Sequence, residues 1–164
     1  MILTQATLNY MFDCKPEEGL LINRYDRGRA MKGEIAGWLS AEGYYKTKIR
    51  GDTYFIHQLL WLHVYGYIPK EMDYINGIRS DNRIVNLREA TRTQNLANAK
   101  LPTGISGLRG VNMNESGSKW RAMIHYGGQH IFLGNYDTKE EAAAVYKKAA
   151  DHIYGEYALH NRPA

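Results

Sequence analysis

The sequence of 164 residues predicts an α+β protein built from small modules. Two observations lead to this fold class. Apolar residues recur at helical spacing in residues 54–65 and 138–153, and several short runs with the character of strands are bounded by turn signals. We therefore expect a small N-terminal β arm, a helix, hairpin and helix in the centre, and a three-stranded antiparallel sheet packed on one helix.

Residues 1–52 form the expected N-terminal arm. The sequence indicates a short helix from Thr4 to Phe12 and strands at 19–23 and 43–49. The stretch 24–37 between these strands is rich in Arg, Lys and Gly, which is typical of an exposed loop and equally of an extended arm that contacts a partner.

Residues 53–99 form the expected central module, in which a helix is followed by a compact hairpin and a second helix. The expected elements are a helix at 54–65 that ends at Gly66, strands at 72–75 and 83–87 around an Asn76-Gly77 turn, and a helix from Thr91. Asn-Gly is a strong turn signal because both residues accept positive φ.

Residues 100–107 contain one Pro and two Gly and predict a linker, and residues 108–164 predict the last module. Its expected elements are strands at 108–113, 119–126 and 129–133, a Gly127-Gly128 hairpin turn, and a helix that begins with a Thr138 to Glu141 capping box. Apolar residues at helical spacing then continue to a stop at Gly155.

Composition limits the classes of function. The net charge of +4 favours a polyanionic partner. A single cysteine, Cys14, excludes an internal disulfide framework and a cysteine-based zinc site, and we expect it to be a buried apolar thiol. No apolar run reaches the length of a membrane span and the N-terminus shows no signal-peptide pattern, so we expect a cytoplasmic protein without a membrane partner.

Residues 57–98 carry several polar motifs in a fixed order. They are Asp73-Tyr74-Ile75-Asn76-Gly77, Asp81-Asn82-Arg83-Ile84-Val85-Asn86-Leu87, and Thr91-Arg92-Thr93-Gln94-Asn95. This series resembles the phage-type HNH homing endonucleases. The resemblance implies a ββα-metal fold in which Asp73 and Asn95 hold one divalent cation per site, Mg²⁺ or Mn²⁺, while Asn86 braces the hairpin. A hard cation prefers such oxygen ligands, and the implied reaction is hydrolysis of a phosphodiester bond in duplex DNA.

Tyr74 departs from the family pattern, which has a general-base histidine at this position. An ordinary phenol has a pKa about three units above that of imidazole and is a poor base at neutral pH. Three readings stay open: Tyr74 is an activated base or nucleophile, Tyr74 is an inactivating replacement, or another histidine such as His57 or His63 serves as the base. For His57 a structural role is an equal alternative.

Residues 104–160 resemble the APETALA/ethylene-response-factor domain of plants and phage endonucleases, through Gly107 to Val111, Ser118 to Ala122, Phe132 to Thr138 and Glu140 to Ala143. That family packs a helix under the sheet and inserts the other face into the major groove. Strand alternation and this resemblance together nominate as DNA-contacting residues Arg109, Gly110, Arg121, Met123, His125, His130 and Phe132. Trp120 is expected either in the core or stacked on DNA.

In related phage endonucleases the stretch before the nuclease core contacts DNA. The basic residues that would do so here are Arg24, Arg27, Arg29 and Lys32, or Lys46, Lys48 and Arg50 on alternate positions of a strand. A solvated basic face remains the alternative.

We therefore expect a Mg²⁺-dependent DNA endonuclease or nickase of mobile-element type, encoded by a phage, monomeric and acting in the cytoplasm of a bacterial host. Two alternatives remain: a DNA-binding or regulatory protein with a silent nuclease site, and a module that binds an acidic protein.

Overall fold

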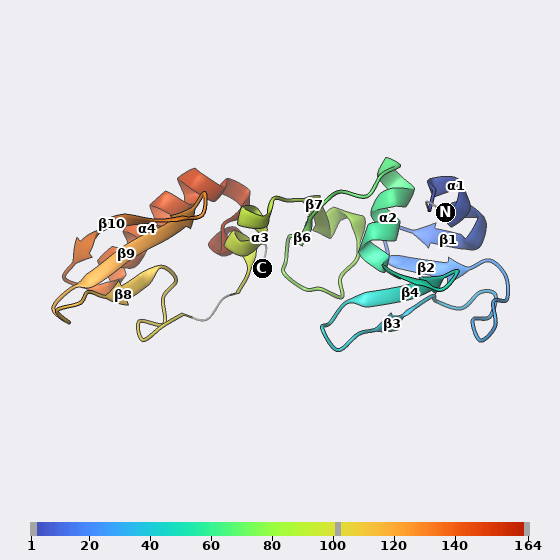
Figure 1. Ribbon diagram of the computed structural model, residues 1–164, viewed down its shortest axis with the longest axis horizontal. Coiled ribbons are helices and arrows are strands. Elements are labelled where there is room, and N and C mark those ends of the chain that lie inside the picture. The colour runs from blue at the N-terminus through green and yellow to red at the C-terminus, as the bar shows by residue number, and fades with distance from the viewer. Residues whose placement is uncertain (1–2, 101–102, 163–164) are drawn as a thin grey trace. The chain divides into compact units, whose positions relative to one another are not determined.

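The computed structural model describes residues 3–100 and 103–162, and the chain forms two compact units that meet between Glu89 and Ala90. Both units mix helices with small antiparallel sheets, as Figure 1 shows, which confirms the α+β fold class. Every helix in the described part is too short or too polar to cross a lipid bilayer.

Residues 3–89 of the N-terminal unit form three small antiparallel sheets and two α-helices. Its elements are α1 Gln5–Met11, β1 Phe12–Lys15, β2 Leu20–Asn23, β3 Trp38–Leu39, β4 Tyr45–Ile49, β5 Asp52–Phe55, α2 Ile56–Tyr65, β6 Met72–Tyr74, the 3₁₀ turn η1 Ile84–Asn86, and β7 Leu87–Glu89. The sheets are β1-β2, β3-β4-β5 and β6-β7. The helices expected at 4–12 and 54–65 are confirmed, and the second ends at Gly66 with a left-handed φ of 83°.

Helix α2 carries the main core of this unit. Leu59 and Leu60 are fully buried against Phe12 and Leu21 from the first hairpin, with Cys14 partly buried at the edge. Burial also raises the pKa of the Cys14 thiol to about 11, as expected for an inert thiol. The predicted boundary between residues 52 and 53 does not appear as a break in packing, and as a functional division it stays a prediction.

The stretch 24–37 is exposed over most of its length but is held by backbone hydrogen bonds. Gly33 N donates to Asn23 O at 2.8 Å and Ala36 N donates to Leu21 O at 2.7 Å, which lays residues 33–36 beside β2. At Gly37, φ is 103° and a Cβ atom would fall 2.5 Å from the carbonyl oxygen of Lys46. Glycine therefore allows the loop to approach β4 closely.

The central hairpin differs from the one that the sequence predicts. Strand β6 pairs with β7 in the register Met72 to Glu89, Asp73 to Arg88 and Tyr74 to Leu87. The returning strand expected at 83–87 is wrong, because residues 84–86 form a 3₁₀ turn and the strand begins at Leu87. The Asn76-Gly77 turn exists, with Gly77 N donating to Tyr74 O at 2.8 Å, but it opens a long loop instead of joining two paired strands.

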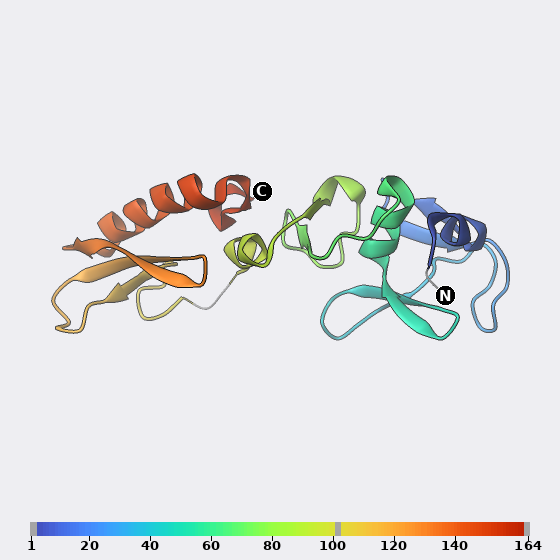
Figure 2. The same cartoon turned by 45° about the horizontal axis from the view of Figure 1, so that its top comes forward.

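The C-terminal unit is a three-stranded antiparallel sheet with a long helix on one face, as Figure 2 shows. Its elements are α3 Arg92–Asn98, β8 Val111–Met113, β9 Trp120–Tyr126, β10 Gln129–Tyr136, α4 Lys139–Tyr154, and the 3₁₀ turns η2 Gly155–Tyr157 and η3 Leu159–Asn161. Gly127 and Gly128 both have positive φ and form the expected hairpin turn. The Thr138 to Glu141 capping box is confirmed.

Ala122 and Ile124 of β9 are buried beneath α4, where they meet Ala142 and Ala150. Trp120 is partly buried in the same core, in agreement with the expectation of a core role. The small side chains of α4 bring the helix close to the sheet, so this core is thin.

Helix α3 belongs to the C-terminal unit. Two guanidinium nitrogens of Arg109 donate to the carbonyl oxygens of Leu96 and Ala99, at 2.5 and 2.7 Å, and Arg162 donates to Asn98 Oδ1 at 2.8 Å. Within the predicted linker, residues 101 and 102 lie outside the described residues. Ser106, at its end, is buried and donates to Val111 O at 2.6 Å, so this part is folded onto the sheet.

Candidate functional site

Asp73 lies in the middle of β6, where the strand register places it opposite Arg88. Both side chains are buried, and Oδ2 of Asp73 accepts hydrogen bonds from Nε and Nη2 of Arg88 at 2.9 and 2.7 Å. A buried carboxylate needs such a partner, because burial of an isolated charge is costly. The structure thus fixes the carboxylate that the sequence nominates as a metal ligand.

Tyr74 follows Asp73 and points its hydroxyl into a buried polar network. Its Oη lies 2.7 Å from Nδ1 of His57, which stands in the first turn of α2, and donates to Oδ1 of Asn82 at 3.1 Å. The His57 and Tyr74 rings meet edge to face, with centroids 5.2 Å apart. The structure therefore joins two of the three residues proposed as a base, while His63 lies apart and contacts Asn9 at 2.7 Å.

Burial determines the protonation states of this network. It lowers the pKa of His57 to about 4. It also raises the pKa of Tyr74 well above the ordinary phenol value; the nearby Tyr44 acts in the same direction, and the smaller effect of Arg79 opposes it. Both shifts favour the neutral form of the group at neutral pH.

Asn86 closes the loop between β6 and β7. Its Nδ2 donates to Asp81 O at 2.8 Å, and its Oδ1 accepts from Asn76 N at 3.0 Å. These two hydrogen bonds brace the loop, and the role of Asn86 in the site stays a prediction. Asp81 also pairs with Arg83 at 2.6 Å, and the arginine keeps the pKa of that carboxyl below its usual range.

The sequence analysis missed Arg88 and Asn82 as parts of the site. Arg88 is recognisable only when the second strand is placed at residues 87–89, because that register sets it opposite Asp73. Asn82 was visible in the motif, but its partner Tyr74 is known only from the folded loop.

Asn95, the other nominated metal ligand, lies half-buried on α3 in the C-terminal unit, whereas Asp73 lies in the N-terminal unit. Their joint role in binding a metal stays a prediction. Among residues 3–100 and 103–162, His, Cys, Asp and Glu side chains form no cluster of three that would hold an ion. One carboxylate and one amide oxygen still suit a hard cation that keeps several waters.

The open face of the C-terminal sheet carries five of the seven residues that the sequence nominated, namely Arg121, Met123, His125, His130 and Phe132. The register pairs His125 with His130, Met123 with Phe132, and Arg121 with Asn112 and Asn135, so each pair shares a face, and this face is the one opposite α4. The His125 and His130 rings lie 5.0 Å apart, and Phe132 is largely exposed. Whether these residues contact DNA stays a prediction.

Arg109 and Gly110 have structural roles that the sequence analysis did not foresee. The Arg109 guanidinium binds the carbonyl groups at the end of α3. A Cβ atom at Gly110 would fall 2.1 Å from a ring carbon of Tyr146, so packing against α4 requires glycine there. Their nomination as DNA-contacting residues therefore rests on the resemblance alone.

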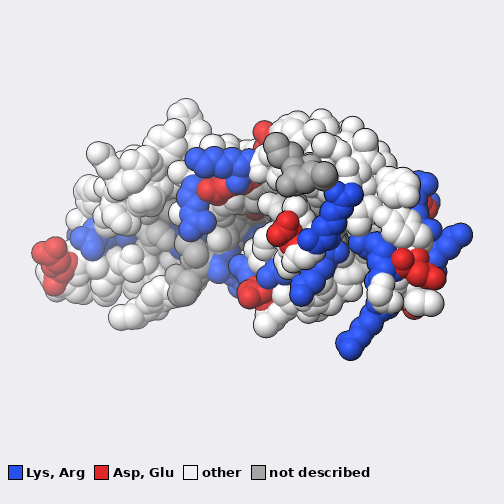
Figure 3. Space-filling view, turned by 45° about the vertical axis from the view of Figure 1, so that its right-hand side comes forward, with Lys and Arg blue, Asp and Glu red and all other residues white. Residues whose placement is uncertain are grey.

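Lys and Arg side chains also project from the N-terminal unit, where Figure 3 shows them among scattered acidic ones. Several already have partners within the unit: Arg24 donates to Phe12 O at 2.9 Å, Arg27 donates to Asn23 Oδ1 at 2.7 Å, and Lys46 pairs with Glu42 at 3.2 Å. Arg29, Lys32 and Lys48 are exposed. The structure therefore does not choose between the basic residues at 24–32 and those at 46–50 as the residues that would contact DNA.

Comparison with known proteins finds similarity in the segment that contains Asp73, Tyr74 and Asn86. Residues 54–97 match the family model described as HNH endonuclease. The chain is 29% identical over 127 residues to the uncharacterized HNH endonuclease L560 of Acanthamoeba polyphaga mimivirus, an alignment that covers 76% of this chain and 66% of the viral protein.

Two plant proteins share a shorter similarity. The chain is 30% identical over 94 residues to the ethylene-responsive transcription factor WRI1 of Arabidopsis thaliana, which covers 56% of this chain and 20% of that protein. It is 38% identical over 60 residues to the AP2-like ethylene-responsive transcription factor At1g16060 of the same plant, covering 35% and 17%. The chain thus spans less than two thirds of the viral protein and a fifth or less of the plant proteins. The similarity to HNH endonucleases thus centres on residues 54–97.

Proposed function

We propose that the protein is a DNA endonuclease or nickase of the HNH type that hydrolyses a phosphodiester bond in duplex DNA. The match of residues 54–97 to the HNH endonuclease model carries this proposal. The geometry supports it, because Asp73 lies on a short strand and the loop that follows is braced by Asn86, as the family pattern implies. Homing activity, a phage origin, a monomeric state and a cytoplasmic location remain predictions.

The proposed cofactor is one divalent cation, Mg²⁺ or Mn²⁺. Asp73 provides the carboxylate, and the resemblance adds the amide of Asn95. A bound cation would stabilise the charge that develops on the departing oxygen. Arg88 orients the Asp73 carboxylate through its two hydrogen bonds to Oδ2, which limits the directions from which the carboxylate is approached.

Of the two residues joined by this hydrogen bond, His57 is a more suitable base than Tyr74. Its Nδ1 lies 2.7 Å from the Tyr74 hydroxyl, whose proton is directed to Asn82 Oδ1. In this arrangement His57 donates from Nδ1, and Nε2 remains the acceptor nitrogen of the neutral ring. Tyr74 would then be a positioning residue that fixes the imidazole.

A second candidate function is a DNA-binding or regulatory protein with a silent site. One observation favours it: Tyr74 is 7% exposed and its hydroxyl is engaged by two side chains, so the position that holds a catalytic histidine in the family is closed here. The two functions differ in whether DNA is cut.

A nicking assay separates them. Supercoiled DNA is incubated with Mg²⁺ or Mn²⁺ and the wild-type protein, or with Tyr74→His, Tyr74→Phe, His57→Gln or Asp73→Ala variants. The endonuclease proposal requires metal-dependent nicking by the wild type that Asp73→Ala abolishes. If only Tyr74→His nicks DNA, the silent-site function holds. If His57→Gln nicks as fast as the wild type, His57 is not the base.

A further inference from the structure

The N-terminal unit contains a pocket of about 630 Å³ that the proposed nuclease chemistry does not use. One wall is the stretch from Asn23 to Trp38, and the other is β4 with the tip of the β4-β5 hairpin. Strand β3 pairs with β4 only at Lys46 and Tyr45, and the pocket opens beside the remainder of β4. Its size suits a small organic group, because ligand pockets range from about 300 to 1,000 Å³.

The charges around this pocket favour an anion. Four cationic side chains line it and one carboxylate does, that of Glu34. The cations are Arg27, Arg29, Lys48 and Arg50. The pocket residues therefore have a net charge of +3, against +4 for the whole chain, so most of the excess positive charge of the protein is concentrated here.

Arg27 lines the pocket and is held by contacts with Asn23 and Phe12. Its Nη2 donates to Oδ1 of Asn23 at 2.7 Å, and its guanidinium lies 4.5 Å from the centroid of the Phe12 ring. Asn23 is itself fixed by donating to Glu34 O at 3.1 Å. Nε of Arg27 is buried and has no hydrogen-bond partner in the described part of the chain, which leaves a donor unsatisfied.

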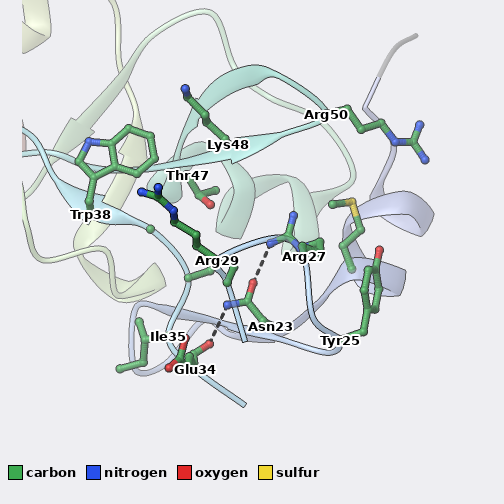
Figure 4. A pocket seen from close by; sticks show the side chains of 14 residues that line it. Asn23, Tyr25, Arg27, Arg29, Glu34, Ile35, Trp38, Thr47, Lys48 and Arg50 are labelled. Carbon is green, nitrogen blue, oxygen red and sulfur yellow. Dashed lines mark hydrogen bonds between the residues drawn. The ribbon is translucent and has the colours of Figure 1, made fainter. Parts of the chain in front are cut away.

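An exposed aromatic ring stands at one end of the pocket. Figure 4 shows Trp38 near Arg29 and Lys48, with Tyr25 and Arg50 toward the other end. Trp38 is 44% exposed, and the neighbouring lining includes Ile35 and Ala36. A flat ring beside cations is the combination on which unpaired bases stack while their phosphates are neutralised.

We infer that this pocket binds one unpaired nucleotide of a DNA strand, with its base against Trp38 and its phosphate among Arg27, Arg29 and Lys48. A paired base within a duplex does not enter such a pocket, whereas an extruded or single-stranded nucleotide does. This inference rests on the proposed function only in taking DNA as the partner. It adds that the protein prefers DNA with a base outside the helix.

The test compares two duplexes of identical sequence, one fully paired and one in which a single base faces an abasic site and is therefore unpaired. Binding of fluorescently labelled DNA to the full-length protein is measured by anisotropy. We expect the duplex with the unpaired base to bind about 10-fold more tightly, because its base can stack on the aromatic ring of Trp38. Equal affinities for the two duplexes would overturn the inference.

Variants test whether the preference for the duplex with an unpaired base comes from this pocket. Trp38→Ala and Lys48→Gln should remove most of the preference, and Trp38→Phe, which keeps a ring, should retain it. The matched controls are Tyr65→Ala, an exposed aromatic residue of α2, and Lys139→Gln, an exposed lysine of α4, neither of which lines the pocket. A preference that survives both Trp38→Ala and Lys48→Gln would place the unpaired base elsewhere and reject the pocket.

Two competitors test the identity of the ligand. A free deoxynucleoside monophosphate that displaces the unpaired-base duplex at equimolar concentration would show that the pocket takes a small nucleotide instead of a strand. Displacement by poly-glutamate at equal charge concentration would show that it takes an acidic peptide. Either result overturns the inference. Failure to nick DNA with the preference intact would reject only the endonuclease, and nicking without the preference would reject only the pocket.

Discussion

The candidate nuclease site of the N-terminal unit and the open sheet face of the C-terminal unit differ in how far their polar side chains are exposed. In the N-terminal unit, Asp73, Arg88, His57 and Tyr74 are all buried and hydrogen-bonded to one another or to the loop. In the C-terminal unit, the open face of the sheet presents its polar and aromatic side chains to solvent. Burial with hydrogen bonds fixes the positions of the first set, whereas side chains on an exposed face contribute little to the stability of the fold.

The largest expected effect comes from Phe12→Ala in the N-terminal unit. Phe12 is fully buried in the aliphatic core, and its loss should reduce the free energy of unfolding of that unit by about 3–5 kcal/mol. Urea denaturation combined with hydrogen exchange would follow the two units separately. An equal loss in the C-terminal unit would contradict the division into two units.

The second largest effect is expected from breaking the buried ion pair between Asp73 and Arg88. Asp73→Ala leaves the buried guanidinium of Arg88 without the carboxylate, and should reduce the free energy of unfolding by about 3 kcal/mol. The double variant Asp73→Leu with Arg88→Met should recover most of that loss, because both charges are then absent. A double variant as unstable as the single one would show that the pair is not the cause. The control is Asp13→Ala, which breaks an exposed ion pair with Lys15. It should leave the urea midpoint of unfolding unchanged.

The third prediction concerns pH. The pKa of His57 falls from 6.5 to about 4 on folding, so the unfolded chain takes up this proton at a higher pH than the folded protein. The associated stability is fully present above about pH 6.5 and is lost as the pH falls toward 4, by about 2.5 kcal/mol at pH ~4.5. Urea midpoints measured from pH 7 to 4.5 should fall in the wild type and fall much less in His57→Gln. If the urea midpoint fell equally with pH in the wild type and in His57→Gln, His57 would not be the group that titrates.

Phe132→Ala in the C-terminal unit makes the same substitution as Phe12→Ala, and it should have the smallest effect on stability. Phe132 is 57% exposed, so Phe132→Ala should change the free energy of unfolding by about 0.5 kcal/mol or less. If the open face contacts DNA, the same variant should weaken duplex binding by about 10-fold, as measured by titration at fixed salt. A variant that is strongly destabilised, or that binds DNA normally, would remove the contrast between the two units.

The sequence predicted the local elements well wherever the signal lies within a few residues. The Thr138 to Glu141 capping box, the Gly127-Gly128 turn and the helix stop at Gly66 are confirmed because each depends on backbone geometry at its own position. Strand alternation holds as well, because Ala122 and Ile124, which alternate with the residues nominated for the open face, are buried.

Features that depend on contacts distant in sequence were not predictable. The strand at residues 87–89 was placed too early, since the preceding turn is closed by the Asn86 side chain. The buried state of Tyr74 depends on His57, 17 residues away, and no local pattern indicates it. The pocket that includes Trp38 forms only when the stretch 23–38 folds against β4, so the sequence indicated its charges but not its shape.

The hydrogen bonds of Arg109 and Arg162 to the last turn of α3 have a consequence for how such chains recombine. They attach the helix that bears Asn95 to the C-terminal unit, although residues 54–97 match a single family model. An exchange of C-terminal parts between relatives would keep these contacts with a joint anywhere before α3, for example at the boundary between Glu89 and Ala90. A joint in the glycine-containing stretch after α3 would separate the helix from the arginines that hold it.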